Sequence, residues 1–127
     1  MRFILNMPMP PLPFKSFHIY EARPKSNLPD QFVISITSAT YVSRQETSFL
    51  TVVPLREFQI TYDHPLIVIV DPAANRDIEL VRPLAAYVSS IQSIPSHLYI
   101  PHSQGEISEV VKKELKKKLN GWLDLGS

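Results

Sequence analysis

The pattern of apolar and polar residues along this chain predicts a series of short β-strands followed by one helix. Residues 49–55 form an apolar run rich in β-branched residues and interrupted only by Thr51, which predicts a mostly buried central strand. Pro54 has no amide donor, so the strand is expected to bulge there, end there or lie at an edge. The charged residue that follows, Arg56, would then be displayed at a bend.

Two further strands are expected before this central run. Residues 16–22 alternate in polarity, which predicts a half-buried strand with Phe17, Ile19 and Glu21 on one side and His18 and Tyr20 on the other. Residues 31–37 predict the second strand. Between them, the Pro, Asn and Asp content of residues 23–30 predicts a loop long enough to be functional.

After the central run, residues 66–70 (LIVIV) are fully apolar, so both faces of this strand are expected to be covered by protein. Asp71 to Asn75 predict a turn, and residues 77–81 are expected to return as the second strand of a hairpin. Residues 84–94 fit either a strand or an irregular crossing segment. Short strands are also expected at 59–62 and 97–100, and a solvated connection at 38–48.

The last predicted element is an amphipathic helix over about residues 104–120. Ser103 and Glu106 fit a capping box at its start, and Asn120-Gly121 fits a left-handed stop at its end. We favour a solvent-exposed face for the lysines of this helix over a nucleic-acid-binding patch. The apolar face is expected to hold Ile107, Val110, Val111, Leu115, Leu119 and Trp122, opposite Lys112, Lys113, Lys116, Lys117 and Lys118.

Length and composition narrow the class of protein. The 127 residues suffice for one domain, expected at 15–127, with residues 1–14 as a proline-rich N-terminal arm. A net charge of +1 gives no overall field that would draw the chain onto nucleic acid. No cysteine is present, and no apolar run approaches the roughly 20 residues that span a membrane. We therefore expect a cytoplasmic protein that contacts no membrane.

Spacing alone assembles no catalytic or metal site. The four histidines, His18, His64, His97 and His102, are scattered without the i, i+4 placement of a helical metal pair. Asp71 and Asp77 flank a turn and are interpreted as turn and cap residues. Because phosphate-binding and dinucleotide-binding motifs are also missing from the sequence, we expect neither a cofactor nor a metal.

The order of elements nevertheless resembles a known group of proteins. HIYEARPKSNLPDQFVISITSA, then LTVVPL, a hairpin and the terminal helix are similar to the superfamily of bacterial toxins that includes the MazF and PemK-like ribonucleases and the gyrase poison CcdB. The resemblance covers about residues 17–125. It implies a mainly β fold, an SH3-like small β-barrel with a C-terminal helix, a symmetric homodimer, and a cognate antitoxin whose flexible tail wraps the toxin.

The ribonuclease branch implies an Arg-Pro before the second strand and a Ser or Thr two residues after the proline of the central strand. This chain has Leu28-Pro29 and Arg56 in those places, and residues 89–93 replace an Asp-Gln-x-Arg motif of PemK-like enzymes. RNA cleavage needs a proton acceptor and a cation to stabilise the phosphate. If the chain is a ribonuclease, Arg56, Arg23 and His18 are the candidate residues.

The CcdB branch fits the second half of the chain better. In CcdB-like chains the segment after the helix inserts into gyrase, and Gly121, Trp122 and Leu123 lie in that place. The first expectation is therefore a non-enzymatic toxin of a type II toxin-antitoxin system that inhibits DNA gyrase or another topoisomerase. The alternatives are a divergent endoribonuclease (mRNA interferase) acting on single-stranded RNA, and an inactive barrel that serves as an interaction module.

Overall fold

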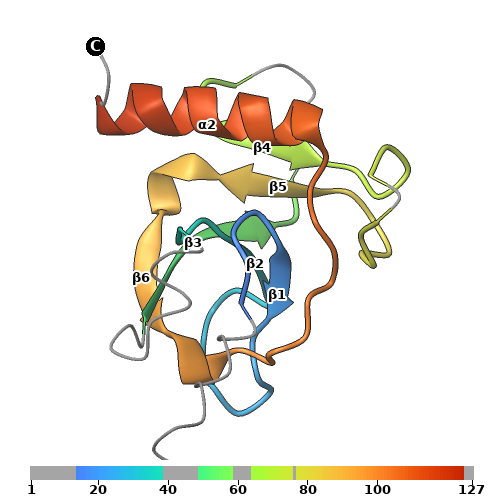
Figure 1. Cartoon of the computed structure of the whole chain (residues 1–127), viewed down its shortest axis with the longest axis vertical. Coiled ribbons are helices and arrows are strands. Elements are labelled where there is room, and N and C mark those ends of the chain that lie inside the picture. Colours follow the sequence, from blue (N-terminus) through green and yellow to red (C-terminus); the bar gives the residue numbers. More distant parts are fainter. Residues whose placement is uncertain (1–13, 39–48, 59–63, 76, 125–127) are drawn as a thin grey trace, which may run out of the picture.

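A bent antiparallel sheet and one C-terminal helix make up the computed structural model, which describes residues 14–38, 49–58, 64–75 and 77–124 (Figure 1). The predicted class, mainly β with one C-terminal helix, is confirmed. The strands are β1 (Ile19–Glu21), β2 (Phe32–Ser35), β3 (Phe49–Arg56), β4 (Ile67–Val70), β5 (Leu84–Tyr87) and β6 (Gln92–Pro95); the helices are η2 (Val88–Ser90), η3 (Ser96–Leu98) and α2 (Glu109–Leu123).

The strand order is β1-β2-β3-β5-β4, and β6 also pairs with β3. In the part of the chain that the structure describes, no pairing joins the end strands β1 and β4, so the sheet is not closed into a barrel. The long strand β3 runs through its middle, as the sequence predicts for this run. It has β2 along one side and, along the other, first β6 and then β5.

Pro54 lies inside β3, where the predicted bulge, strand end or edge does not occur. It is opposite Val33 of β2, and Ile36 donates its amide to the Thr51 carbonyl. By the alternation of an antiparallel ladder, the Pro54 nitrogen therefore faces away from β2. On that side β6 pairs only up to Val52, and β5 begins at Leu55. The proline thus occupies the interval in which β3 changes partner and needs no donor.

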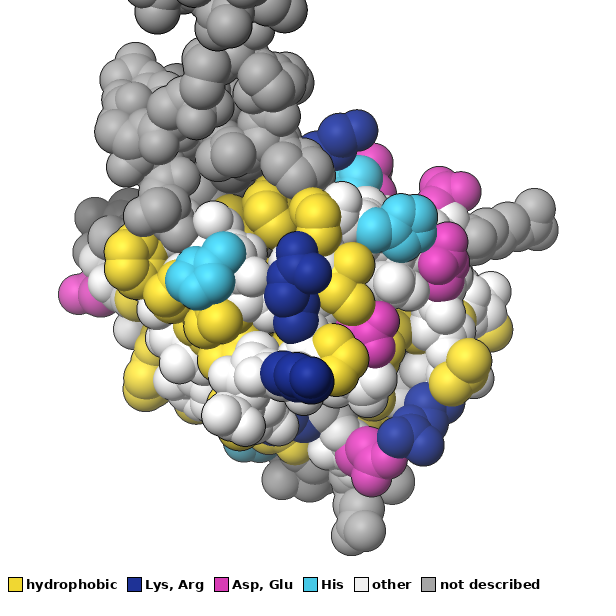
Figure 2. Space-filling model, turned by 90° about the horizontal axis from the view of Figure 1, so that it is seen from below, with side chains coloured by type: hydrophobic (Ala, Val, Ile, Leu, Met, Phe, Trp, Pro, Cys, Tyr) yellow, Lys and Arg dark blue, Asp and Glu magenta, His cyan; other side chains and the backbone are white. Residues whose placement is uncertain are grey.

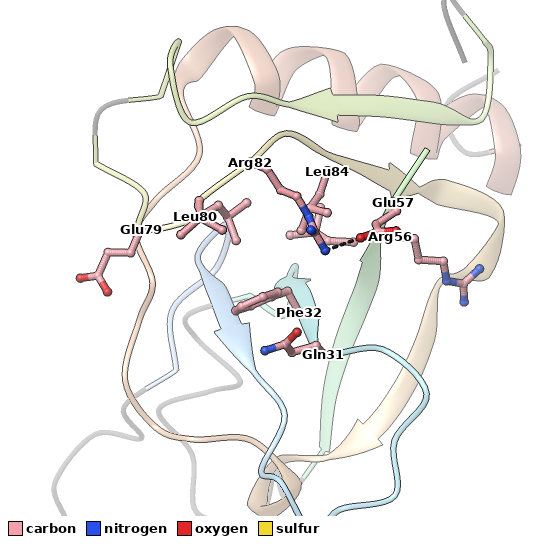
Figure 3. A pocket seen from close by; sticks show the side chains of 10 residues that line it. Gln31, Phe32, Arg56, Glu57, Glu79, Leu80, Arg82 and Leu84 are labelled. Carbon is pink, nitrogen blue, oxygen red and sulfur yellow. Dashed lines mark ion pairs between the residues drawn. The ribbon is translucent and has the colours of Figure 1, made fainter. Parts of the chain in front are cut away.

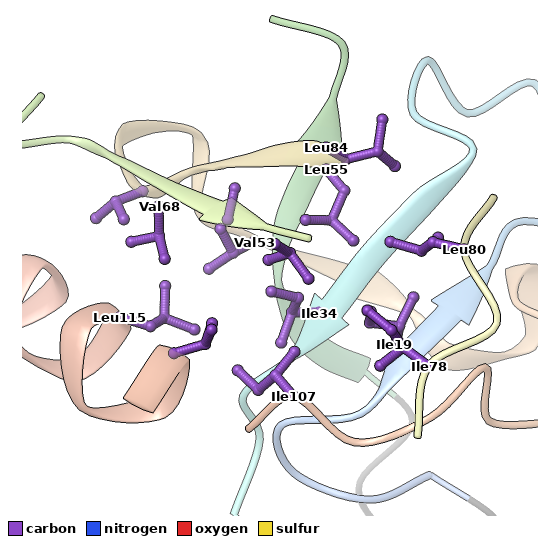
Figure 4. Close-up of a cluster of buried hydrophobic side chains, with 14 of the residues drawn as sticks. Ile19, Ile34, Val53, Leu55, Val68, Ile78, Leu80, Leu84, Ile107 and Leu115 are labelled. Carbon is purple, nitrogen blue, oxygen red and sulfur yellow. The ribbon is translucent and has the colours of Figure 1, made fainter. Parts of the chain in front are cut away.

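Hydrophobic side chains are buried on both faces of β1, β2 and β3. Ile19 points into the cluster beneath α2, whereas its neighbour Tyr20 belongs to a second cluster on the opposite face, and both are fully buried (Figure 4). The expectation that the first strand is half-buried is therefore wrong. Phe14 packs edge-on against Tyr20 with the ring centroids 4.9 Å apart, which covers the second face.

The hairpin after the central strand has different strands from those predicted. β4 pairs with β5, whereas residues 77–81 form no strand and cross beside the core with Ile78 and Leu80 buried. Alternation of apolar residues there reflects contact with the core and not pairing in the sheet. Ile69 is 39% exposed, so β4 is not covered on both faces as expected. β4 is an end strand of the sheet, which explains this exposure.

Both interpretations of residues 84–94 hold in part, because β5 and β6 are strands and η2 between them turns the chain. The strand expected at 97–100 is wrong, since η3 covers its first half. The strand expected at 59–62 and residues 39–48 of the expected connection lie outside the described residues, as do residues 1–13 of the arm.

Helix α2 begins and ends later than predicted. Ser108 is its N-cap and accepts a hydrogen bond from the Val111 amide, whereas the Ser103 hydroxyl accepts from Gly105, so the predicted capping box is wrong. The helix continues through Gly121 to Leu123, and Asp124 provides the left-handed end.

The predicted faces of α2 are only partly correct. Val111, Leu115 and Leu119 are buried against the sheet, but Val110 and Trp122 are exposed. Lys118 is not solvated as expected, since its ammonium donates to the carbonyls of His64 and Ile67. Within the described ranges, no helix has the length and apolar character needed to cross a bilayer.

Candidate functional site

The end of β3 carries an ion pair between Arg56 and Asp30. The Arg56 Nε donates to the Asp30 Oδ1 at 2.7 Å, and Nη2 donates to Oδ2 at 3.2 Å, which is the two-point geometry that makes arginine–carboxylate pairs strong. Asp30 is only 9% exposed, whereas the Arg56 side chain is 40% exposed. The carboxylate is therefore fixed in the protein, while the guanidinium remains open to a ligand.

Two further groups hold the Arg56 guanidinium. Its Nη1 donates to the Ser90 hydroxyl at 3.3 Å, and its central carbon lies 5.4 Å from the centre of the Tyr87 ring, within the range of a cation–π contact. Hydrogen bonding to Asp30 raises the pKa of Arg56 above its ordinary value, against the smaller effect of burial. Arg56 is thus a permanent cation held in a fixed orientation.

These groups come from separate segments that the fold brings together. Asp30 ends the loop before β2, Arg56 ends β3, Tyr87 ends β5, and Ser90 lies in η2. The antiparallel pairing of Phe32 with Leu55 places the loop end beside the end of β3. The pairing of Arg56 with Ala85 places β5 on the other side, so η2 follows close to the guanidinium.

A cleft of about 430 Å³ adjoins this pair, between the start of β2, the end of β3 and the segment before β5. Phe32, Leu55, Leu80 and Leu84 give it an apolar wall, and Gln31, Glu57 and Arg82 supply polar groups. Figure 3 shows the Arg56 side chain pointing away from the other lining residues. The guanidinium and the cleft therefore present two neighbouring surfaces rather than one enclosed cavity.

Arg23 and His18, the other candidates for phosphate chemistry, do not share a partner with Arg56 in the described part of the chain. Arg23 lies in the 23–30 loop, is exposed, and donates from Nε to the His97 carbonyl at 3.0 Å. Figure 2 shows the face at the foot of the molecule, where Lys and Arg side chains stand among hydrophobic, histidine, acidic and uncharged groups. Arg23 is accordingly interpreted as a loop anchor.

His18 packs near the start of α2. Its Nδ1 lies 2.7 Å from the Ser103 hydroxyl, and its backbone forms an isolated bridge with Glu106. Burial lowers the pKa of His18 below its ordinary value, and the nearby Glu106 carboxylate opposes this effect. These contacts tie the first strand to the segment before the helix, which is a structural role.

The predicted target-binding residues lie at the C-terminal end of α2. Trp122 is 48% exposed and Leu123 is 43% exposed, and a side chain added at Gly121 would point into open space. Trp122 also borders a shallow cleft with Pro65, Leu66 and Lys117. These residues form an accessible apolar edge, and the charged group fixed beside it, Lys118, has its ammonium held by the carbonyls of His64 and Ile67.

In the described ranges, no three His, Cys, Asp or Glu side chains lie close enough together to hold a metal ion. Asp30 and Ser90 escaped the sequence-based prediction. Ser90 lies within residues 89–93, where the resemblance implied reactive residues, whereas Asp30 lies two residues after the marked position Leu28.

No protein-family model matches the chain, and no curated protein matches it. Solved structures with a similar fold do exist. They include the Mycobacterium tuberculosis toxin MazF-mt6, with 21% identity over 87% of this chain and 99% of that chain and a TM-score of 0.66. An endoribonuclease in complex with its cognate antitoxin from a mycobacterial species has 13% identity, coverages of 90% and 98%, and a TM-score of 0.66.

A MazE-MazF structure from Deinococcus radiodurans has 14% identity, covers 88% of this chain and 96% of that chain, and has a TM-score of 0.63. At these identities the likeness shows the fold, which is MazF-like. Membership of the CcdB/MazF superfamily and the closer relation to CcdB in the second half both stay predictions.

Proposed function

We propose that this chain is the toxin of a type II toxin-antitoxin system and that it cleaves single-stranded RNA at the end of β3. The observation that carries the proposal is the open Arg56 guanidinium, held by the nearly buried Asp30 carboxylate in a MazF-like fold. This pair supplies the cation and the proton acceptor that the reaction needs. The pair can provide the cation and the proton acceptor although the chain lacks the Arg-Pro and the Ser or Thr of the ribonuclease branch.

Two of the three places that the resemblance marks as reactive converge here, and Asp30 lies two residues after the third, which Leu28 fills. Asp30 follows Pro29 before β2, Arg56 occupies the place of the hydroxyl on β3, and Ser90 lies in the segment of the missing Asp and Arg. Compared with the ribonuclease branch, the cation thus lies on β3 instead of before β2, and the hydroxyl lies in η2 instead of on β3. Rearrangement of groups within one site supports a divergent ribonuclease rather than loss of chemistry.

The reaction follows from the contacts. Arg56 has five N–H donors, of which three meet Asp30 and Ser90, so two remain in the described site for a phosphate. Asp30 accepts the proton of the ribose 2′-hydroxyl, whose oxygen attacks the adjacent phosphorus while Arg56 stabilises the added negative charge. The bond to the 5′-oxygen breaks, and that oxygen takes a proton from water. The products are a 2′,3′-cyclic phosphate and a 5′-hydroxyl.

The proposal includes two partners that follow from the resemblance. A cognate antitoxin would bind the chain and block RNA cleavage; in support, one structural neighbour is an endoribonuclease in complex with its cognate antitoxin. We also propose a homodimer. Sedimentation of the purified chain, alone and with the product of a neighbouring short reading frame, measures both associations.

The direct test incubates the purified chain with a single-stranded RNA oligonucleotide of mixed sequence. Fragments ending in a cyclic phosphate are expected. The matched control has the same sequence with deoxyribose at every position and must stay intact, because the attacking hydroxyl is absent. RNA that remains whole over long incubation, with a correctly folded protein, would reject the ribonuclease function.

A second candidate function rests on the exposed Trp122 and Leu123 at the end of α2, the edge predicted to bind gyrase. If this function is correct, the purified chain should inhibit DNA supercoiling by gyrase and leave RNA whole. Trp122→Ala should then relieve the inhibition. Unchanged supercoiling would exclude it. If expression causes no growth arrest and both assays show no activity, the remaining hypothesis is an inactive barrel that serves as an interaction module.

A further inference from the structure

The cleft beside Arg56 contains a donor–acceptor pair over an apolar floor. Arg82 and Glu57 form an ion pair through Nη2 and a carboxylate oxygen, and their side chains are 63% and 72% exposed. Phe32 and Gln31 line the same cleft, and Figure 3 shows the Phe32 ring between Gln31 and the Arg82–Glu57 pair. Aromatic, amide, guanidinium and carboxylate groups are thus gathered around one opening.

The Arg82–Glu57 pair is available to a ligand. Exposed ion pairs contribute little to stability because water solvates both charges well. Arg82 lies in the segment that leads to β5, and Glu57 follows the last residue of β3. A polar ligand that offers its own donors to Glu57 and its own acceptors to Arg82 can therefore replace the pair at low cost.

The cleft and the Arg56 guanidinium lie on two sides of the end of β3. Consecutive residues at a strand end point to opposite faces, so Arg56 and Glu57 diverge. Arg56 faces Asp30 and Ser90, while Glu57 faces Arg82 across the cleft. A single strand that crosses the end of β3 would set a phosphate on the first side and a neighbouring base on the second.

We propose that this cleft binds a guanine base next to the phosphate that Arg56 holds; the placement beside a cleaved phosphate rests on the proposed ribonuclease function. Guanine presents two adjacent N–H donors that match the Glu57 carboxylate, and an acceptor edge that matches the Arg82 fork. Phe32 offers a half-buried ring for stacking, the usual device for holding an unpaired base. The volume of about 430 Å³ lies in the range of small-molecule sites.

The composition of the cleft distinguishes guanine from the other bases. Adenine, cytosine and uracil lack the paired N–H donors of the guanine Watson–Crick edge, so each leaves the Glu57 carboxylate with at most one partner. A good two-point contact discriminates by tenfold or more. An acidic side chain of a peptide, the other class of ligand that Arg82 attracts, offers only acceptors and so leaves the Glu57 carboxylate without a donor.

The test follows the backbone amide resonances of the isotopically labelled full chain during titration with the four nucleoside 5′-monophosphates. All four carry the same phosphate, so a difference between them reports on the base. GMP is expected to shift Gln31, Phe32, Leu80 and Leu84 with at least about tenfold tighter binding than AMP, CMP or UMP. Glu57→Gln should abolish the preference. Glu109→Gln, the same change at an exposed site on α2 outside the cleft, should keep it.

Mapping of cut sites in a long RNA of mixed sequence separates this proposal from the ribonuclease proposal. Guanine next to the cut, lost in Glu57→Gln, supports both. Selective GMP binding without any RNA cleavage rejects the ribonuclease and retains the guanine site. Equal binding of the four nucleotides, no shift in the cleft, or an undiminished preference in Glu57→Gln overturns the guanine site, whatever the RNA assay gives.

Discussion

The end of β3 and the end of α2 are the two regions that the sequence nominates for function, and they are built differently. At the end of β3, four separate segments meet around Arg56, and a nearly buried carboxylate fixes the cation. At the end of α2, Gly121, Trp122 and Leu123 are neighbours in sequence, and Trp122 and Leu123 are each a little under half exposed.

This contrast indicates where reactive chemistry can be held. Catalysis requires groups kept in a fixed orientation, and convergence of several segments restricts Arg56 in a way that a helix end cannot. An exposed apolar edge suits contact with a macromolecular partner instead, because such contact needs area rather than alignment. Single substitutions in each region can test whether the two are separate.

Asp30→Asn should have the largest effect. The amide keeps the shape of the carboxylate but cannot accept the proton, so RNA cleavage should fall by about 10²- to 10⁴-fold. The measurement is the single-turnover cleavage rate, with circular dichroism to confirm the fold. Asp71→Asn is the matched control, since Asp71 caps an exposed turn and should leave cleavage unchanged. Equal rates for both variants would remove Asp30 from the reaction.

His18 should affect stability and not chemistry. Because burial lowers its pKa, the unfolded chain binds a proton below the ordinary pKa of 6.5 while the folded chain does not. The free energy of unfolding should therefore decrease as the pH falls from 6.5 towards the lower pKa of the folded state. His18→Gln should flatten this dependence in urea denaturation and leave the RNA cleavage rate unchanged.

A second group contributes with the same sign but at lower pH. The hydrogen bond from Lys112 lowers the pKa of Glu106, so its contribution is lost only as the pH falls below the ordinary 4.5. Denaturation measured between pH 6.5 and 4.5 therefore isolates His18. A stability profile that His18→Gln does not alter in this window would contradict the assigned structural role.

Trp122→Ala should have the smallest effect. The side chain is 48% exposed, so the free energy of unfolding should change by no more than about 0.5 kcal/mol, and RNA cleavage should keep the wild-type rate. Thermal denaturation and the cleavage assay measure the two quantities. A large loss of cleavage would mean that the end of α2 belongs to the reactive site and that the two regions are not separate.

Local patterns in the sequence predicted the central strand and the amphipathic helix, because continuous burial and helical periodicity act over adjacent residues. The partner of β4 was missed, since alternation at Ile78 and Leu80 arises from a crossing segment that touches the core. The Ser108 cap was missed because Ser103 satisfies the same local pattern. Only the folded chain shows that Asn75 binds the Ser108 amide and fixes the true start.

At the candidate site, Arg56 was identified from its place after Pro54. Its partner Asp30 was not, because the two are 26 residues apart and meet only through the register of β2 and β3. Sequence patterns carry no information on that register before the pairing is known. The resemblance marked the positions of Arg56 and of residues 89–93 but not that of Asp30, so the pairing of cation and carboxylate emerged only in three dimensions.

The sharpest measurement is the cleavage rate of one single-stranded RNA by the wild-type chain, Arg56→Ala and Arg23→Ala. Arg56→Ala should lose about 10²- to 10³-fold in rate, because it removes the cation that stabilises the charge on the phosphate. Arg23→Ala removes an exposed loop arginine with no contact to Asp30 or Ser90 among its described partners, and should cleave at the wild-type rate. Equal cleavage by wild type and Arg56→Ala would contradict a reactive site at the end of β3.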